Sequence, residues 1–212
     1  MPDRETPYPG LLVDFGGVLT GNVFEVFAGF CEREGLETDH VARAFREDPV
    51  TRELLFGLEL GELTEDDFSG RFAASIGLGP ERVEGLIGRL WQDLAPDEEM
   101  IEAVAGFHAA GVKTGLISNS WGTALEYDEK TMARLFDGLV ISHLEGMRKP
   151  DPKIYALGAA RIGLSPADCV FVDDLRGNLK PARALGMMTV HHTTAAETIP
   201  QLEELLGVTL PA

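Results

Sequence analysis

The sequence predicts an α/β fold with a doubly wound parallel sheet and an all-helical segment inserted after the first strand. The first observation is an apolar run, Leu11 to Val13, that meets Asp14 and then two glycines, as a buried strand does where it ends in a tight turn. The second is that the chain from about Asn22 to Trp91 shows only helical periodicity. The third is that strand-length apolar runs alternate with helical patterns beyond residue 96, which implies right-handed crossovers between parallel strands.

The inserted segment is expected to hold four or five short helices. Its leucines fit core packing better than a ligand role. Helix start signals recur along the segment, at Thr38-Asp39, at Thr64 with Asp67, and at Pro80. We therefore expect an α/β core of residues 1–20 and 96–212, and a helical cap of residues 21–95 over the carboxyl ends of the strands.

The elements beyond residue 96 alternate between helix and strand. Gly111 ends the first helix, and Asp151 followed by Pro152 indicates the start of a later one, because proline is favoured at the first helical position. In chain order we expect a helix over 98–110, a strand over 112–117, a helix near 127–136, a strand over 138–142, a helix over 152–162, strands over 169–172 and 188–190, and a last helix near 199–206.

The composition excludes several classes of partner. The 212 residues carry a net charge of −17, which argues against nucleic acid and anionic membrane surfaces, since both require clustered Lys and Arg. Cys31 and Cys169 lie in apolar segments, which favours two reduced core thiols over a disulfide or a metal site. Met1–Pro9 lacks the apolar core of a signal peptide, and no apolar run is long enough for membrane insertion. We expect a cytoplasmic protein, and the sequence leaves its oligomeric state open.

Four sets of polar residues follow the apolar strands, at the ends where open α/β sheets bind ligands. They are Asp14, Ser118 with Asn119, Lys149, and Asp173-Asp174 with Asn178. Each set has a structural alternative, in which Asp14 caps a turn, the Ser and Asn residues cap helices, and Lys149 is a solvated loop lysine. The adjacent acids fit this alternative least, because two carboxylates after a buried strand repel each other unless a cation or a donor offsets them.

Together these sets supply the groups that phosphoryl transfer requires. A carboxylate can attack phosphorus, a hydroxyl and an amide can hold the transferring oxygens, an ammonium can offset charge, and a second acidic group can anchor Mg²⁺. In a protein of such negative net charge, an anionic substrate needs a local positive group of this kind.

The order of these residues resembles that of the haloacid dehalogenase-like hydrolases. In that family an aspartate follows the first strand, a Ser or Thr follows the second, a Lys precedes a later helix, and paired acids follow the fourth strand. The resemblance covers nearly the whole chain and implies a Rossmann-like core with the helical cap of one branch of the family. Val170 to Arg183 and Ser118 to Trp121 are similar to the N-terminal phosphatase domains of bifunctional epoxide hydrolases. The epoxide hydrolase half has no counterpart here, so epoxide opening is not implied.

The resemblance implies a hydrolase that removes phosphate from a small phosphorylated metabolite through an aspartyl-phosphate intermediate. Asp14 would be the nucleophile. It would also bind Mg²⁺, together with the backbone carbonyl of Gly16 and the carboxylate of Asp174, since Mg²⁺ prefers such oxygen ligands.

The same resemblance assigns supporting roles to the other strand-end residues. Ser118 and Asn119 would hold the transferring phosphoryl oxygens, while Lys149 would offset their charge and that of the nucleophile. Asp173 and Asn178 would orient these groups.

Gly16 departs from the family pattern. Phosphatases of this family carry a second aspartate two residues after the nucleophile, which protonates the leaving group and activates water. Loss of a positioned acid-base typically costs about 10²–10⁴-fold in rate. We therefore expect a preference for leaving groups that depart without protonation. Glu25, Glu53 and Glu59 of the cap are possible replacements, and the sequence does not rank them.

Three other functions remain open. A 2-haloacid dehalogenase also uses an aspartate nucleophile without the second acid, but it needs no metal, so Asp173-Asp174 argues against it. A catalytically impaired module that binds phosphoryl ligands would explain Gly16 as lost catalysis. A phosphomutase or phosphotransferase ranks last, because it relies on the missing acid-base.

Two further patterns concern the substrate and the metal. Phe24, Phe27, Phe45 and Phe56 either line an apolar pocket for a lipid-like phosphate or pack in the cap core, and their helical spacing is more typical of a core. His191-His192 follows the last strand. Because adjacent residues of an extended segment point to opposite faces, joint metal ligation is disfavoured and a surface loop is expected.

Overall fold

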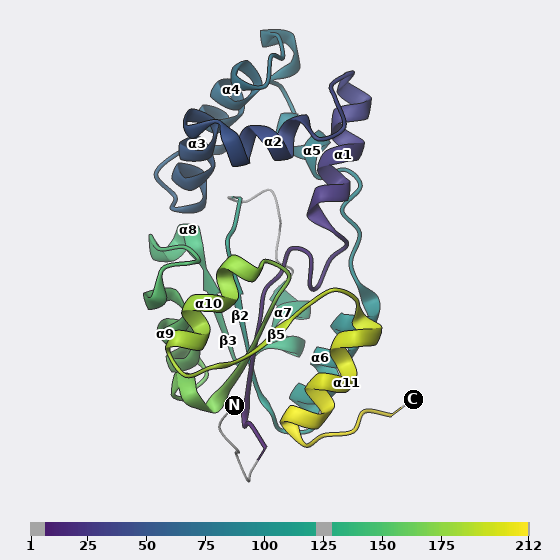
Figure 1. Ribbon diagram of the computed structural model, residues 1–212, viewed down its shortest axis with the longest axis vertical. Helices are drawn as coiled ribbons and strands as arrows, with labels where there is room; N and C mark the ends of the chain where they lie inside the picture. The colour runs from purple at the N-terminus through teal and green to yellow at the C-terminus, as the bar shows by residue number, and fades with distance from the viewer. Residues whose placement is uncertain (1–6, 122–128, 212) are drawn as a thin grey trace.

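The computed structural model describes residues 7–121 and 129–211. Within these residues, five parallel strands form one sheet in the order β3-β2-β1-β4-β5 (Figure 1). The strands are β1 (Gly10–Val13), β2 (Lys113–Ser118), β3 (Gly138–Ile141), β4 (Cys169–Asp173) and β5 (Met188–His191). The chain enters the sheet at its centre, adds strands on one side and then on the other, and so confirms the doubly wound arrangement.

The central strand β1 is buried along its whole length. Leu11 pairs with Thr114 of β2 and with Val170 of β4, so β1 has a hydrogen-bonded neighbour on each edge. A parallel strand that helices cover on both faces needs apolar residues at successive positions rather than in alternation. This explains why no polar side chain precedes Asp14 in the strand.

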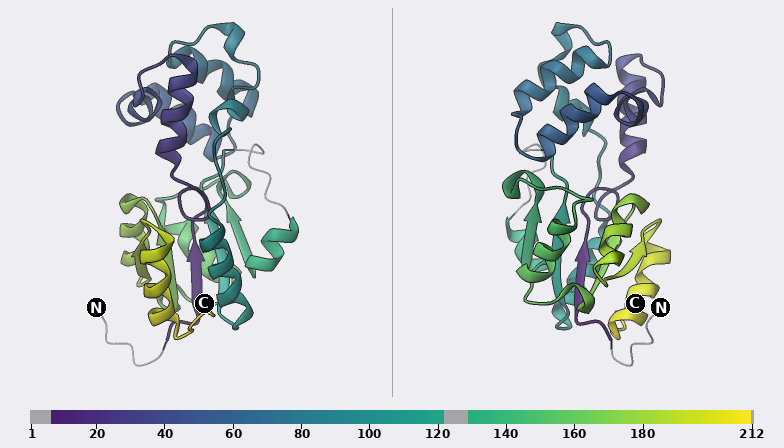
Figure 2. Two further views of the ribbon diagram at one scale, coloured as in Figure 1. Left: turned by 90° about the vertical axis from the view of Figure 1, so that its right-hand side faces the viewer. Right: turned by 60° about the vertical axis from the view of Figure 1, so that its left-hand side comes forward.

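Helices cover both faces of the sheet, as Figures 1 and 2 show. Phe107 and Leu202 belong to the apolar core on one face, and Ile154 and Tyr155 belong to the core on the other. The helices of the first face are α6 (Glu98–Ala109), α7 (Glu129–Leu135) and α11 (Ala195–Leu206), and those of the second are α9 (Pro152–Arg161) and α10 (Arg176–Ala184).

A second group of helices lies beyond the carboxyl ends of the strands (Figures 1 and 2). These helices bury a core of their own, in which Phe30, Phe68 and Phe72 are fully enclosed. They are α1 (Val23–Glu34), α2 (His40–Glu47), α3 (Pro49–Glu59), α4 (Glu65–Ser75), the 3₁₀ helix η1 (Pro80–Arg82) and α5 (Leu86–Leu90).

The chain segments that lead into and out of this helical group meet at an antiparallel bridge between Thr20 and Pro96. We propose that the bridge marks the boundary between a core of residues 1–20 and 96–212 and a cap of residues 21–95. We use the word cap for the helical group in this sense.

Two of the predicted helix starts have the expected hydrogen bonds. The Thr64 side chain accepts from the backbone N–H of Asp67 at the start of α4, and Asp151 accepts from that of Lys153 at the start of α9. Such bonds satisfy backbone donors that have no partner within the helix. Pro80, by contrast, opens only the three residues of η1.

Several element bounds differ from the sequence prediction. The strand expected over 138–142 ends at Ile141, because Ser142 begins the short helix α8 (Ser142–Glu145). The last helix begins at Ala195 rather than near 199, since Thr194 caps it by accepting the Glu197 N–H. Of the helix expected near 127–136, only α7 is described, and residues 127 and 128 lie outside the described residues.

The cysteines and the hydropathy agree with the composition argument. Cys31 is buried in the cap core and Cys169 in the core beneath α9 and α10, and no disulfide joins them. Among residues 7–121 and 129–211, no helix is long and apolar enough to cross a membrane.

Candidate active site

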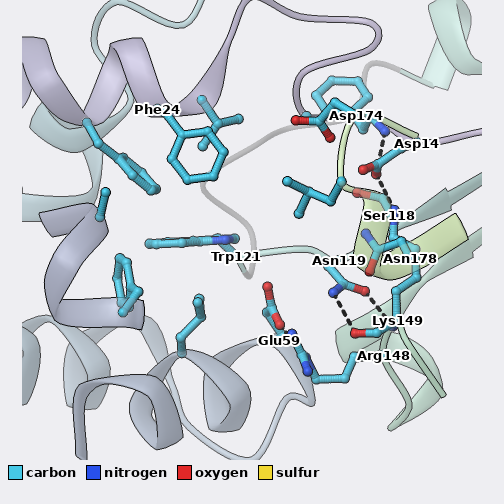
Figure 3. Close-up of a pocket in the computed structure, with 18 of the residues that line it drawn as sticks. Asp14, Phe24, Glu59, Ser118, Asn119, Trp121, Arg148, Lys149, Asp174 and Asn178 are labelled. Carbon is cyan, nitrogen blue, oxygen red and sulfur yellow. Dashed lines mark hydrogen bonds and ion pairs between the residues drawn. The ribbon is translucent and has the colours of Figure 1, made fainter. Parts of the chain in front are cut away.

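All of the predicted strand-end residues except Asp173 line one cavity of about 470 Å³ between the sheet and the cap (Figure 3). Asp14 directly follows β1, Ser118 ends β2, and Asp173 ends β4, so three adjacent strands deliver their last side chains to one edge of the sheet. The residues at the sheet end of this cavity are here called the cavity floor, and they are Asp14, Ser118, Asn119, Lys149 and Asp174.

Lys149 is the electrostatic centre of the floor. Its Nζ lies 2.6 Å from Asp14 Oδ1 and 2.8 Å from Asp173 Oδ2, and its side chain is only 1% exposed. Burial alone would lower the pKa of Lys149, but the carboxylates of Asp14 and Asp173 outweigh burial and hold the pKa above its usual range. The lysine is therefore a fixed cation, and the solvated-loop alternative for Lys149 is wrong.

Asn119 fixes the backbone that carries this lysine. Its Oδ1 accepts the Lys149 backbone N–H at 2.8 Å, and its Nδ2 donates to the Lys149 carbonyl at 3.1 Å. The two bonds tie the end of β2 to a loop thirty residues later. Asn119 therefore uses its side chain to hold the loop rather than to cap a helix, and Ser118 beside it is buried as the last residue of β2.

Asp173 is fully buried and forms an ion pair with Lys149. Besides Lys149, it accepts two 3.0 Å bonds from Asn178 Nδ2 and one 2.8 Å bond from the Leu175 backbone N–H. Tyr155 in turn donates to the Asn178 carbonyl at 2.8 Å. Asn178 lies inside α10, so the alternative that it caps this helix is wrong, and its amide instead keeps Asp173 in place.

Three carboxylates converge on the floor. One oxygen each from Asp14, Asp173 and Asp174 lies within 4.8 Å of the others. Burial, and then the neighbouring Asp173 carboxylate, raise the pKa of Asp174 to about 6. When all three carboxyl groups are ionised, their charge exceeds that of the Lys149 ammonium by two, which is what a divalent cation would balance. Hard oxygen donors in this number suit Mg²⁺.

The turn after β1 brings Asp174 against the backbone. Gly17 has a φ of +76°, and a β-carbon there would lie 2.6 Å from Asp174 Oδ2. Only glycine accepts both this left-handed conformation and this close approach without strain. Of the two glycines in the turn, Gly17 is therefore required by geometry, whereas a β-carbon at Gly16 would meet only Val23 Cγ2 at 3.3 Å.

At the position of the second aspartate in the family pattern, this chain has Gly16, which has no side chain that could act as an acid. Of the three cap glutamates considered as replacements, Glu25 and Glu53 are exposed and do not line the cavity. Glu59 is buried, lines the cavity, and forms an ion pair with Arg148. Of the three glutamates, Glu59 is therefore the one that lies at the cavity.

Aromatic side chains line the cap end of the cavity, which is here called the cavity roof. Figure 3 shows Phe24 and Trp121 on this side, opposite Asp14 and Ser118. The ring centroids of Trp121 and Trp91 are 4.9 Å apart, and those of Trp121 and Phe45 are 5.5 Å apart. The roof residues are Phe24, Phe27, Phe45, Trp91 and Trp121.

Three of the four phenylalanines singled out in the sequence therefore line the cavity. Phe27 does so while also packing in the cap core, so the two alternatives are not exclusive. Phe56 is not a lining residue, and its ring instead carries the Arg148 guanidinium, 3.9 Å above its centroid. Trp91, Trp121 and Arg148 also line the cavity, and the sequence alone does not identify them as cavity residues. Trp121 lies two residues after Asn119, Arg148 lies immediately before Lys149, and Trp91 ends the helical pattern of the cap.

The two adjacent histidines at the end of β5 have separate partners. His191 Nε2 lies 2.9 Å from the Asp174 carbonyl, and His192 Nδ1 lies 2.9 Å from Thr198 Oγ1. His191 ends β5 and His192 is buried, so the surface-loop expectation is wrong. Burial lowers the pKa of His192, which favours the neutral ring.

Comparison with protein families and known sequences gives a consistent set of relatives. A family model for haloacid dehalogenase-like hydrolases matches residues 8–186. The sesquiterpene phosphatase astK of Aspergillus oryzae is 31% identical over 70% of this chain and 77% of its own length. Acyl-CoA dehydrogenase family member 10 of Mus musculus is 29% identical over 96% of this chain, and bifunctional epoxide hydrolase 2 of Rattus norvegicus is 32% identical over 53% of it. The matches span only 20% and 21% of these two longer proteins.

Solved structures share the fold. A HAD family enzyme of Bacteroides thetaiotaomicron, in complex with magnesium and inorganic phosphate, superimposes with a TM-score of 0.62 at 21% identity, over 87% of this chain and 93% of its own. A dehalogenase superimposes with a TM-score of 0.70 at 19% identity, over 97% of this chain and all of its own. At these identities the likeness establishes the architecture and not the reaction.

Proposed function

The chain belongs to the haloacid dehalogenase-like hydrolases, and on that premise we propose that it is a Mg²⁺-dependent phosphatase that acts on a small phosphomonoester through an aspartyl-phosphate intermediate. The observation that carries the proposal is the cavity floor, where a nucleophile, a fixed ammonium and an acidic cluster meet at the ends of β1, β2 and β4. That a relative covered over most of its length is a phosphatase supports it.

In the first step, a carboxylate oxygen of Asp14 forms a bond to phosphorus while the bond from phosphorus to the ester oxygen breaks. The alcohol oxygen leaves with the electron pair and takes up a proton. In the second step, water adds to the phosphorus and loses a proton, and the bond to Asp14 breaks. The carboxylate is restored and inorganic phosphate is released.

The other floor residues hold the phosphoryl group. Lys149 offsets the negative charge that gathers on the phosphoryl oxygens. The carboxylates of Asp14 and Asp173 keep it charged, and its ion pairs in a buried position keep it immobile. Ser118 and the Asn119 amide hold those oxygens, with Asn119 also fixing the Lys149 backbone. Asp173 and Asn178 orient Lys149 from outside the cavity floor.

We propose that Asp14, the Gly16 carbonyl and Asp174 hold Mg²⁺. The ion, when bound, would offset the two excess negative charges of the carboxylate cluster and polarise the phosphoryl group. Asp173 is less available as a ligand, because Lys149, Asn178 and the Leu175 N–H already occupy its oxygens.

We further propose that the organic part of the substrate is apolar. It would lie against the cavity roof, where Phe24, Phe45 and Trp121 offer aromatic faces and almost no hydrogen-bonding groups. A cavity of about 470 Å³ has room for a group of drug-like size. The name of the fungal relative, a sesquiterpene phosphatase, agrees with an apolar substrate class.

The first experiment is release of phosphate from p-nitrophenyl phosphate, with and without Mg²⁺, by the wild type and by Asp14→Asn. We expect Mg²⁺-dependent turnover that falls by at least about 10³-fold in the variant, because the variant lacks the nucleophile. Unchanged turnover in Asp14→Asn would overturn the mechanism. Absence of turnover in a folded wild type that still binds phosphate with Mg²⁺ would favour a binding module instead.

A second candidate function is a 2-haloacid dehalogenase. Gly16 favours it, because displacement of halide needs no acid at this position, and the fold is shared with a dehalogenase. The carboxylate cluster opposes it, since nothing in halide displacement calls for the two further carboxylates of Asp173 and Asp174 beside the nucleophile. Chloride release from 2-chloropropionate without added metal would establish this alternative.

A further inference from the structure

Arg148 lies between the floor and the roof of the cavity and belongs to neither. It immediately precedes Lys149 and lines the same cavity. Its Nε donates to a carboxylate oxygen of Glu59 at the end of α3, and its guanidinium carbon lies 3.9 Å above the Phe56 ring. Figure 3 shows Arg148 and Glu59 side by side between Trp121 and Lys149.

These contacts fix the guanidinium without using all of it. The Arg148 side chain is 19% exposed and that of Glu59 is 6% exposed. Within residues 7–121 and 129–211, the two terminal amino groups of Arg148 make no hydrogen bond to another residue. A planar group with several donors is thus held by one edge and one face, and its remaining donors are left for a molecule in the cavity.

The position of Arg148 matches one atom of the substrate. If the phosphoryl group lies on the floor and the organic part lies against the roof, the ester oxygen is the atom that joins them. Arg148 is the cationic side chain at that junction, one residue from Lys149 and paired with a cap residue. Arg46, the other arginine of the cavity lining, pairs with Glu47 on the cap surface and is 65% exposed.

We propose that Arg148 stabilises the departing ester oxygen, in place of the carboxylic acid that Gly16 lacks, and that Glu59 is a positioning residue for it. The inference rests on the proposed phosphatase function. As the bond from phosphorus to the ester oxygen breaks, the electron pair moves onto that oxygen, and the Arg148 N–H groups donate to it. Arginine keeps its own protons, so the alcohol is completed by a proton from water, and the hydroxide that remains attacks the aspartyl phosphate.

The ion pair with Glu59 makes the stabilisation by Arg148 selective for the transition state. Because the carboxylate compensates the guanidinium charge, Arg148 adds little attraction for a second anion of the substrate. Its donors interact more strongly with an oxygen whose charge grows during bond breaking than with the neutral ester oxygen of the bound substrate. The benefit is therefore expected to increase with the basicity of the leaving group.

The test measures kcat/KM for a series of aryl phosphates with increasingly basic leaving groups, and for an alkyl phosphate, in the wild type and in Arg148→Gln. Arg46→Gln is the matched control. We expect Arg148→Gln to lose about 10²–10³-fold on the most basic leaving groups and less than about tenfold on p-nitrophenyl phosphate. The dependence of rate on leaving-group pKa steepens in Arg148→Gln and stays as in the wild type in Arg46→Gln.

Glu59→Gln separates a positioning role from proton donation. Gln keeps an oxygen that can accept the Arg148 Nε–H, so we expect a loss smaller than that of Arg148→Gln and an unchanged pH profile of kcat. If Glu59→Gln instead loses more on basic leaving groups and the pH profile of kcat loses its alkaline limb, Glu59 is the acid and the inference for Arg148 is wrong.

Two further outcomes are distinguishable. A uniform loss across the series in Arg148→Gln, with thermal unfolding unchanged, would show a binding role and overturn the inference while leaving the proposed function intact. A wild type without phosphate release from p-nitrophenyl phosphate would remove the proposed function itself. Should Arg148→Gln fail to fold, Arg148→Lys keeps the charge and loses the planar donors, and we expect the same steepening there.

Discussion

The floor and the roof of the cavity are built by different kinds of interaction. On the floor, directional bonds hold the key side chains: Lys149 binds two carboxylates, and Asn119 binds both polar backbone groups of Lys149. The roof is held by ring contacts, such as the stacking of Phe45 on Phe72 with centroids 5.0 Å apart. Directional bonds specify atoms, whereas apolar packing specifies mainly volume. Substitutions on the floor should therefore change the reaction, and substitutions in the roof should change its substrate range.

The difference between the floor and the roof should be largest when the buried charge of the floor is removed. Lys149→Met leaves Asp14 and Asp173 buried without their cation, and we expect the free energy of unfolding to fall by about 3–5 kcal/mol in urea titrations. The exposed Lys153→Met is the control, with a change within about 0.5 kcal/mol. Burial raises the pKa of the Asp14 carboxyl, so its protonation should make the deficit shrink as the pH falls. A loss in Lys149→Met no greater than in the control would mean that the floor is not held by this lysine.

The acid that the floor lacks can be installed. A β-carbon at Gly16 meets only one atom, Val23 Cγ2, so we expect Gly16→Asp to fold. It should raise kcat/KM for alkyl phosphates by about 10²-fold, and by less for p-nitrophenyl phosphate, since the new carboxyl can protonate the leaving oxygen. Gly16→Asn is the control, because it has the same size and no acid. Equal gains in both variants would point to an effect other than proton transfer.

Substitution of Gly17, the second glycine of the turn after β1, tests the proposed metal site. Gly17→Ala would place a β-carbon against Asp174, and we expect the affinity for Mg²⁺ to fall by about tenfold as a displaced ligand weakens the site. Mg²⁺-dependent increases in the unfolding temperature measure this affinity. Gly146→Ala shares the positive φ, at +61°, but its β-carbon would meet nothing, so it controls for backbone strain. Equal Mg²⁺ affinity in the two variants would contradict the assignment of Asp174 to the metal.

The smallest expected effect belongs to the roof. Phe24 is half exposed, so Phe24→Ala should leave stability nearly unchanged. We expect its KM for naphthyl phosphate to rise by about fivefold through lost apolar contact, with no change for ethyl phosphate. Val50→Ala, an exposed apolar residue of the cap outside the cavity lining, is the control. A parallel loss on both substrates would mean that the roof does not select the organic group.

Much of the floor follows from the chain order alone. A parallel sheet brings the carboxyl ends of its strands to one edge, so Asp14, Ser118 and Asp173 converge once β1, β2 and β4 are recognised. The turn glycines and the Asp151-Pro152 helix start are equally local, because they depend on backbone conformation within a few residues. The start of α11 is less local. Thr194 caps this helix, but the extent of the helix depends on its packing against β5 and α6.

The pairing of side chains across long sequence separations could not be predicted. Glu59 and Arg148 are 89 residues apart, and nothing in either local sequence indicates their contact. Trp121 likewise belongs to a core segment by sequence but packs among cap aromatics, within 5.6 Å of the Phe68 ring centroid. Helical spacing alone could not distinguish the cavity wall from the cap core, because Phe27 takes part in both.

The sequence by itself determined the sheet, the inserted helices and the identity of the strand-end residues, because periodicity, turn glycines and chain order are local or topological properties. Only the tertiary structure decided which glutamate faces the cavity, that Lys149 is a buried cation between two carboxylates, and where Arg148 lies relative to the strand ends. The physical reason is that burial and ion pairing depend on which surfaces meet when the cap helices pack over the sheet, and no short stretch of sequence encodes that meeting.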